Sequence, residues 1–490
     1  MKFSLKLLTL ATLLISSSSY ALPIDWHGVF GVDSTLIDAY RRIDSKTQTT
    51  SGDTTTEPAL ASGGHANASF QTYVFRLNPV LIINDSATLK GEITSGYGRG
   101  GRLGDSSTQA KEANVAHALY TFNRNDTSST NDDLSLTQLY AELYADSATY
   151  LIGRHPNHWA LGAVQNSGEN SWDRHFNVRD GITMKVKLDN FTFSPYWAKI
   201  SSGGSLTRAT NVKEWGISLL YDNSERDFSF GLLYSKKRNN AFNDTIKADV
   251  SSDNTSNGSA LGQNEVKITD IYFKKAFGPV TFAVEVPLFS GEIGYLYNNN
   301  QKAKFGGKAV IIESNYELND NWNFGINAGK VSGDNGIESS FDAMYLNPNY
   351  QIANVLFRYN LSAIANPSGE SVFDSYITNA TYAKFFAQYN SEHWTVKLSY
   401  IFAKAEEVAK SGSSAFNHES YKKFTASANQ KDDLGSEIDL DADYHWNNEI
   451  TVGFSAGYLM TGDYYGFTNT ATENKIDDSI VLQVKTAIKF

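Results

Sequence analysis

The 490-residue sequence contains no cysteine. The chain can therefore form neither a disulfide nor a thiolate metal site, and it lacks the acylated cysteine that a lipoprotein anchor requires. After residue 21 there is no run of 18 or more consecutive apolar residues, so no transmembrane helix is expected. The formal net charge of −11 argues against nucleic acid as a partner, because nucleic-acid recognition needs a basic surface.

One apolar run stands at the N-terminus. Lys2 and Lys6 flank its start, residues 7–15 form its core, and the small residues Ser19 and Ala21 end it. This pattern predicts a signal peptide over residues 1–21, removed before Leu22. Residues 22–490 would then be exported, and loss of the two lysines takes the net charge from −11 to −13.

Segments of roughly ten residues alternate between apolar and polar side chains. The pattern is clear in residues 450–458, 394–402, 322–328, 182–188 and 437–444. Such strands suit either a soluble sandwich or a transmembrane barrel. Three features favour the barrel: tight turns at 84–86, 319–321 and 447–448, long polar loops between the other strand ends, and aromatic residues at strand ends. Those aromatics are Trp26, Trp215, Trp322, Trp394, Tyr444 and Trp446.

We therefore expect an all-β fold, a transmembrane antiparallel up-and-down β-barrel with short periplasmic turns and long extracellular loops. The eighteen expected strands lie near 24–40, 69–83, 87–97, 134–145, 148–155, 181–189, 191–201, 213–222, 227–237, 264–276, 279–291, 304–317, 321–332, 376–389, 392–404, 434–446, 449–460 and 479–490. The loops 43–68, 98–133, 238–263 and 405–433 are expected to be solvated and mobile.

Residues 350–359 also look strand-like, but counting them as a spanning strand would reverse the direction of every later strand. Strand parity favours one outer excursion over residues 333–375, with a piece folded into the lumen. A nineteenth or twentieth strand is the alternative.

Two patterns suggest chemistry without supporting it. Residues 453–457 match the nucleophile-elbow pattern of hydrolases but lie inside an alternating strand. His155, His158 and His175 share one segment, yet no helix would place them on one face as metal ligands. We expect no enzyme activity, no cofactor and no metal.

Charged residues on the polar face of the strands are the remaining candidates for function. Inward positions carry Arg76, Lys90, Glu92, Glu142, Lys185, Lys187, Glu214, Glu285, Lys384, Lys397, Glu437, Asp439, Asp441, Asp443, Lys485 and Lys489. Such charges select solutes by sign when they line a pore. Alternatively, they pair with one another and fill a narrow barrel. Eighteen strands enclose too wide a lumen for side chains alone to fill, which favours the pore.

One stretch carries a family resemblance. Gly153-Arg154, Gly162, Asn166, Trp172, Arg174 and Asp180-Gly181-Ile182 form a run that resembles one in alginate-export-type outer-membrane proteins, a porin-like family. The resemblance implies an eighteen-stranded barrel in which Arg154, Arg174, Arg179 and Asp180 line or brace the pore mouth. The ending Ile488-Lys489-Phe490 is similar to the terminal signal by which the outer-membrane assembly machinery recognises barrels.

The chain departs from that family in its charge. It holds 13 arginines, few at inward positions, and its strand at 437–443 is acidic. An anionic polysaccharide is therefore disfavoured as the substrate.

The sequence thus predicts an integral outer-membrane channel of a Gram-negative-type bacterium. It would contact membrane lipid and lipopolysaccharide and pass small hydrophilic or charged solutes. Tyr350, Phe357, Arg358 and Tyr359 are expected to belong to a constriction loop. The alternatives are an adhesion barrel acting through its long loops, or an exporter of an anionic polysaccharide.

Overall fold

The computed structural model describes most of the chain after the expected signal peptide. The described residues are 24–40, 43–50, 53–60, 66–95, 99–102, 134–201, 212–239, 264–294, 302–358, 376–418, 422–467, 469 and 477–490. Residues 1–21 and Tyr359 lie outside them, as do large parts of the expected long loops. Within the described part, no helix combines the length and the apolar character needed to cross a membrane.

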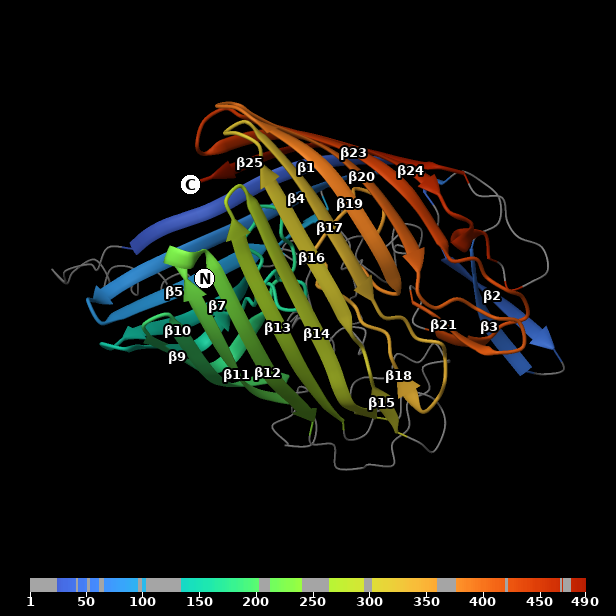
Figure 1. Ribbon diagram of the computed structural model, residues 1–490, viewed down its shortest axis with the longest axis horizontal. Helices are drawn as coiled ribbons and strands as arrows, with labels where there is room; N and C mark the ends of the chain where they lie inside the picture. Colours follow the sequence, from blue (N-terminus) through green and yellow to red (C-terminus); the bar gives the residue numbers. More distant parts are fainter. Residues whose placement is uncertain are drawn as a thin grey trace, which may run out of the picture.

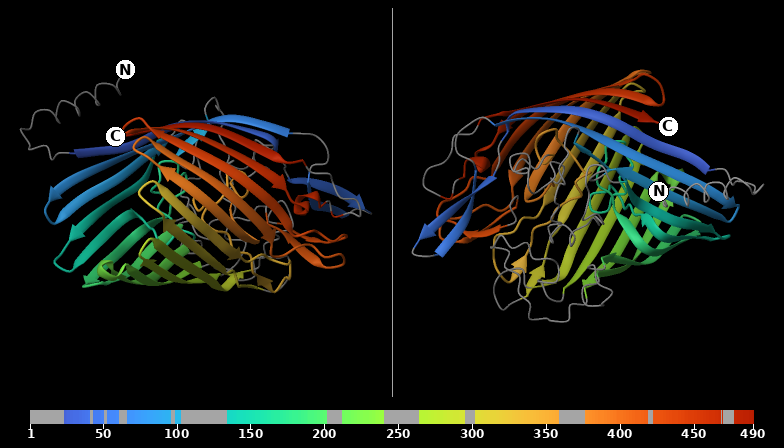
Figure 2. Two further views of the ribbon diagram at one scale, coloured as in Figure 1. Left: turned by 45° about the horizontal axis from the view of Figure 1, so that its top comes forward. Right: turned by 180° about the vertical axis from the view of Figure 1, so that it is seen from behind.

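Eighteen long strands form one closed sheet (Figures 1 and 2). They are β1 (Ile24–Tyr40), β4 (Ala66–Asn84), β5 (Ala87–Ser95), β7 (Leu134–Tyr144), β8 (Ala148–Pro156), β9 (Val178–Leu188), β10 (Phe191–Ser201), β11 (Val212–Asn223), β12 (Phe228–Asn239), β13 (Glu265–Phe277), β14 (Val280–Gly294), β16 (Ala309–Glu317), β17 (Trp322–Val331), β19 (Ala380–Asn390), β20 (Trp394–Ala405), β23 (Asp433–His445), β24 (Ile450–Thr461) and β25 (Ser479–Lys489). Each pairs antiparallel with its neighbours. The sheet closes because β1 pairs with both β4 and β25. The predicted eighteen-stranded antiparallel barrel is confirmed.

The outer wall of the barrel is apolar. Along β17, Trp322, Phe324 and Ile326 are exposed, while the alternate positions Gly325 and Gly329 are buried. Because successive side chains of a strand point to opposite faces, one parity faces out and the other faces the lumen. The same division holds on the other long strands, so the exposed apolar side chains form a continuous outer surface that suits lipid.

The two ends of the barrel differ. At one end, tight turns join the strands. The side-chain oxygen of Asn319 accepts hydrogen bonds from the backbone N–H groups of Asn321 and Trp322, at 3.0 and 2.9 Å. Asn447 caps the turn before β24 in the same way. Phe490 lies at this end, whereas the short strands β2, β3 and β21 lie at the opposite end (Figure 1).

Short elements lie in and around the longer connections. They are β2 (Ile43–Thr50), β3 (Asp53–Leu60), β6 (Gly100–Arg102), β15 (Ala303–Phe305), β18 (Ser340–Phe341), β21 (Ser414–Asn417), β22 (Lys422–Thr425) and the 3-10 turns η2 (Ser224–Arg226) and η3 (Asp463–Gly466). Within the expected outer loops 43–68 and 405–433, the structure shows two paired hairpins, β2–β3 and β21–β22. Their sequences lack a clear apolar alternation, so periodicity did not reveal them. Residues 350–358 belong to no strand.

Candidate functional site

The structure shows which of the charged residues expected on the inner wall face the lumen. Most have inward parity, opposite to the exposed apolar side chains: Arg76, Lys90, Glu92, Glu142, Arg179, Lys185, Lys187, Glu214, Glu285, Lys384, Lys397, Glu437, Asp439, Asp441, Asp443, Lys485 and Lys489. Arg174 reaches the same wall from the connection between β8 and β9. Two residues do not follow the expectation.

Arg154 and Asp180 lie on the outer wall. They are opposite each other on β8 and β9 and form a two-contact ion pair at 2.7 and 2.9 Å. Arg154 is also opposite Leu139, which is exposed on the outer face. The expectation that these two residues line the pore mouth was wrong, because parity on β8 and β9 turns them away from the lumen.

Two long connections fold inward. The first is segment 157–177, which joins β8 to β9 and which we call the first inward segment. It contains buried residues such as Trp159, Val164 and Asp173. The second is residues 343–358, the second inward segment, in which Leu346, Ile352 and most neighbouring residues are buried. Both contact inward-facing side chains of the barrel wall.

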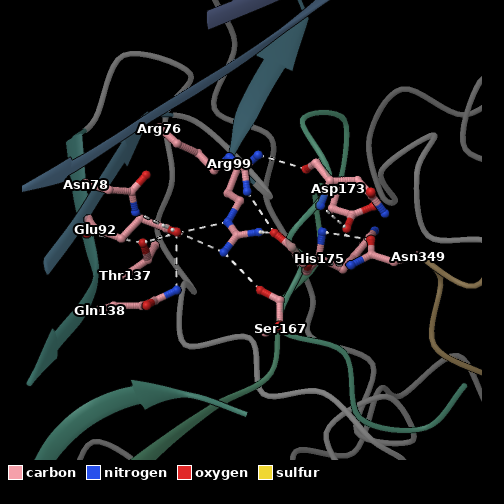
Figure 3. A network of polar contacts seen from close by, with 12 residues as sticks. Arg76, Asn78, Glu92, Arg99, Thr137, Gln138, Ser167, Asp173, His175 and Asn349 are labelled. Atoms are coloured by element: carbon pink, nitrogen blue, oxygen red, sulfur yellow. Dashed lines mark hydrogen bonds and ion pairs between the residues drawn. The ribbon is translucent and has the colours of Figure 1, made fainter. Parts of the chain in front are cut away.

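Arginines hold the first inward segment against the wall (Figure 3). Arg76 donates to the carbonyl oxygens of Gly168 and Asn170, both at 2.7 Å. Arg99 donates to the carbonyl oxygens of Gly168 and Ser167 at 2.5 and 3.1 Å. The guanidinium groups thus bind backbone carbonyls that would otherwise be buried without partners.

Glu92 positions Arg99 for this contact. Its two carboxylate oxygens accept from Nε and Nη2 of Arg99 at 2.8 and 2.9 Å, and the Thr137 hydroxyl donates to the same carboxylate at 2.8 Å (Figure 3). Glu92 and Arg99 are both almost fully buried. Sequence reasoning missed Arg99, because it follows the predicted strand 87–97 in a stretch read as an outer loop.

A glycine is required where the segment meets Arg99. Gly168 has φ +71°, and a Cβ atom there would lie 2.2 Å from a guanidinium nitrogen of Arg99 and 2.4 Å from the carbonyl oxygen of His175. Any other residue would strain the backbone and push the arginine away.

Two further strand groups hold the same segment. The Glu285 carboxylate on β14 accepts from the backbone N–H of Leu161 at 2.8 Å and that of Ala163 at 3.4 Å. Arg174 donates to Asp33 on β1 at 3.2 Å and to Thr72 on β4 at 2.7 Å. The first inward segment is therefore fastened to several sides of the barrel.

One acidic side chain in this segment has a shifted pKa. Burial raises the pKa of Asp173 to about 6, against the opposing influence of the Arg99 and Arg76 charges. Its carboxylate accepts from the backbone N–H of Asn170 at 2.9 Å.

The acidic strand β23 holds the second inward segment. The Glu437 carboxylate accepts three backbone N–H groups in succession, those of Asn354, Val355 and Leu356, at 2.8, 2.6 and 2.8 Å. Asp439 also accepts from the Asn354 N–H, at 3.1 Å. Three consecutive donors around one carboxylate form a backbone nest for an anion.

Other strands complete this attachment. Lys384 Nζ on β19 donates to the carbonyl oxygen of Ile352 at 2.7 Å, and the Tyr350 hydroxyl donates to Glu313 on β16 at 2.9 Å. Arg358 donates to Gln351 at 2.9 Å and to Gln483 on β25 at 3.5 Å. Phe357 has φ +62°, which marks a sharp bend next to this contact.

The two inward segments meet each other. The Asn347 N–H donates to the carbonyl oxygen of Ala163 at 2.7 Å, and its side chain donates to Asn177 at 3.0 Å. Asn349 donates to the carbonyl oxygen of His175 at 2.7 Å and accepts from the His175 N–H at 3.3 Å (Figure 3). Apolar residues of both segments also share one buried cluster. The lumen is therefore narrowed by two segments that support each other.

The remaining inward charges lie nearer the tight-turn end. Lys185 and Lys187 on β9 are exposed to the lumen. Three ion pairs occur at this level: Lys90–Glu142, Lys397–Asp441 and Lys485–Asp443, with N–O distances of 2.5, 4.0 and 3.4 Å. Charges of both signs thus line the lumen below the inward segments.

The histidines do not come together. His155 faces inward on β8 and is hydrogen-bonded to Thr183 at 3.1 Å. His158 accepts from the Ser167 N–H within the first inward segment, whereas the His175 N–H donates to Asn349 of the second inward segment. In the described part of the chain, no group of three or more His, Asp or Glu residues is arranged to hold a metal ion.

The closed sheet, the apolar outer wall and the charged inner wall define a class: an integral outer-membrane β-barrel of porin type. No family model and no curated protein matches the sequence. Among solved structures the chain is similar to Pseudomonas aeruginosa OccK9 (OpdG), with 12% identity, a TM-score of 0.47, and 95% of this chain and 99% of that chain covered. It is also similar to P. aeruginosa OccK8 (OprE), with 11% identity, TM-score 0.46 and coverages of 95% and 98%. The similarity to Acinetobacter baumannii OccAB4 is at 10% identity, TM-score 0.45 and the same coverages.

Proposed function

We propose that this protein is a passive outer-membrane channel for small hydrophilic solutes, and that the two inward segments form its constriction. The observation that carries the proposal is the fastening of both segments to buried charges of the inner wall. A barrel whose only task was to anchor outer loops would not need two connections folded inside it and tied to many of its strands.

The wall charges then divide into two groups. Arg76, Glu92, Glu285, Glu437 and Lys384 hold the inward segments. The charges nearer the tight turns contact water and would attract or repel solutes by sign. Family resemblance suggested an exported anionic polysaccharide, but a lumen narrowed by two attached segments suits a small solute better than a polymer.

Single-channel recording in planar bilayers tests the channel. We expect stepwise conductance from the purified, refolded protein, and its absence at all voltages would refute the proposal. Deleting residues 341–362 should raise the conductance, because it removes the second inward segment. The matched control deletes the outer hairpin 43–60, which lies outside the barrel wall and should leave the conductance unchanged.

Ion selectivity tests the lower lumen. Replacing Lys185 and Lys187 by Gln removes two exposed inward charges and should shift the reversal potential toward cation preference. The control Lys199→Gln changes a lysine on the outer wall of the neighbouring strand β10. An equal shift in the control would show that these two inward lysines do not set the selectivity.

A further inference from the structure

A charged row crosses the outer wall of the barrel at the end away from the tight turns. Strand register places six charged residues in line on six neighbouring strands, β10 to β15: Lys199, Lys213, Arg238, Glu265, Glu292 and Lys304. Each is directly opposite the next across a strand pair. We call these residues the outer charged row.

The row lies just beyond the apolar outer surface. Lys199 and Lys213 are each two residues from an exposed tryptophan of the same strand and parity, Trp197 and Trp215. On β14, Glu292 follows the exposed Leu288 by four residues. Since tryptophans of membrane proteins sit at the headgroup level, the row lies where lipid headgroups meet the outer face.

Positive charge is in excess here. Lys199 is opposite Lys213, which is opposite Arg238 on its other side. Two residues farther along β12 and β13, toward the apolar surface, Lys236 is opposite Lys267. Like charges directly across a strand pair are destabilising, so this arrangement disfavours the isolated barrel unless anions lie between the cations.

The carboxylates of these strands do not balance the cations. Glu265 contacts Lys236 at 2.8 Å and Lys267 at 3.5 Å, so one carboxylate serves two lysines. Glu292 lies 4.0 Å from Lys302. With Lys302 included, the seven described cations Lys199, Lys213, Lys236, Arg238, Lys267, Lys302 and Lys304 exceed the two described glutamates by five charges.

Several of these positively charged side chains line a groove. This groove of about 450 Å³ is lined by residues at the ends of β12, β13, β14 and β15. The ends of these strands lie side by side in Figure 1. Its lining includes Arg238, Lys267, Lys302 and Lys304 together with both glutamates. The volume is within the usual range for small-ligand sites.

Two other lysines on the same rim have carboxylate partners of their own. Lys330 lies 2.6 Å from Glu406, and Lys404 lies 3.7 Å from Asp432. These two lysines therefore differ from the opposed cations of the β10–β15 side and serve as a comparison for them.

We propose that the outer charged row and its groove bind the phosphate-bearing headgroup of lipopolysaccharide in the outer leaflet. Phosphates would supply negative charge between the opposed cations, and Arg and Lys side chains form charge-assisted hydrogen bonds with phosphate oxygens. The groove opens on the wall that faces lipid rather than on the lumen, so a membrane lipid reaches it directly. This site is independent of the channel proposal.

Binding of purified bisphosphorylated lipid A to the refolded protein in mixed micelles tests the site. The variant Lys267→Gln/Lys304→Gln removes two cations of the groove and should raise the Kd about 30-fold, with each lysine contributing as basic residues do near an anionic membrane surface. The matched control, Lys330→Gln/Lys404→Gln, removes two rim lysines that have carboxylate partners and should leave the Kd unchanged. Lys267→Arg/Lys304→Arg should retain binding, which separates loss of charge from a folding defect.

Three arms identify the ligand. Lipid A with its phosphates removed should bind the wild-type protein as weakly as the glutamine variant does. Inorganic phosphate at an equal concentration should not compete with the lipid. The proposal is overturned by equal affinity of the groove and control variants, by full binding of the dephosphorylated lipid, or by competition from inorganic phosphate, which would indicate a site for free phosphate. Conductance should be the same in the groove variant and the wild type, so failure of either proposal is seen separately.

Discussion

The substitution Glu437→Gln tests how the second inward segment is held. The Glu437 carboxylate accepts the N–H groups of three successive residues, 354–356. An amide keeps one acceptor oxygen and turns an NH₂ group toward backbone donors. Hydrogen bonds to a charged acceptor exceed neutral ones by roughly 1 kcal/mol each. Because the amide also avoids the cost of burying a charge, we expect a net loss of about 1–3 kcal/mol in the attachment of the segment.

A loss of that size shifts the equilibrium between the attached and released segment by about 5–150-fold. Released segments should appear as larger conductance steps and increased open-channel noise in single-channel recordings. The control is Asp443→Asn, which removes an inward carboxylate of the same strand that pairs with Lys485 rather than with the segment. It should change ion selectivity without producing the larger conductance steps or the added noise.

Combining Glu437→Gln with deletion of residues 341–362 completes the experiment. The substitution should have no further effect on conductance once its partner segment is gone. If Glu437→Gln alone leaves both conductance and noise at wild-type values, the attachment through β23 does not control the pore and this reasoning fails.

Three further substitutions or conditions report on the inward segments and the outer loops. Gly168→Ala should lower the free energy of unfolding in urea by about 1–3 kcal/mol, because φ is +71° and the added Cβ collides with buried neighbours. The control Gly412→Ala, at φ +80° with open space around it, should lower that free energy less. Equal losses in the two variants would contradict the steric argument. His418 accepts the Asp334 N–H at 2.7 Å, and burial lowers the pKa of His418 to about 3, so the stabilisation is fully present above pH 6.5 and is lost as the pH falls toward 3. The protection factor of the Asp334 amide against hydrogen exchange, taken relative to the intrinsic exchange rate at each pH, should therefore fall between pH 7 and 4.5, and an unchanged protection factor would refute the link. Burial raises the pKa of Asp173 to about 6, so the folded protein binds the proton more tightly than the unfolded chain and its stability falls as the pH rises from 3.8 through 6. Asp173→Asn should therefore stabilise the protein by up to about 3 kcal/mol at pH 8 and by little at pH 4. Lower stability of the variant at pH 8 would show that the carboxylate is needed.

The alternation of apolar and polar residues was sufficient to predict most of the fold. In residues such as 322–328 and 450–458, every second side chain faces the same side of the sheet. Because lipid lies outside the barrel and water inside it, each strand must alternate apolar and polar residues independently of the other strands. The strand count and the outward aromatic residues followed from this local rule. The closed barrel with the expected eighteen strands confirms it.

The family resemblance misplaced two residues, and strand periodicity gave no position for a third. The family resemblance assigned Arg154 and Asp180 to the pore, whereas the structure places them on the outer wall, with the same parity as the exposed residues Ile152 and Ile182. Arg99 lay in a polar stretch with no periodicity, and its role depends on Glu92 and on the carbonyl of a glycine 69 residues away.

The sequence by itself therefore determined that this chain makes a barrel with an apolar outer wall and a charged inner wall, because the residues of each strand alternate between those that suit lipid and those that suit water. Only the tertiary structure decided what the charges do. Arg76 binds the carbonyl of Gly168, Glu437 binds three N–H groups of a segment more than 80 residues earlier, and Lys213 stands opposite Arg238 on the outer wall. These are contacts between distant residues, set by strand register and by the path of the inward segments, and no local pattern encodes them.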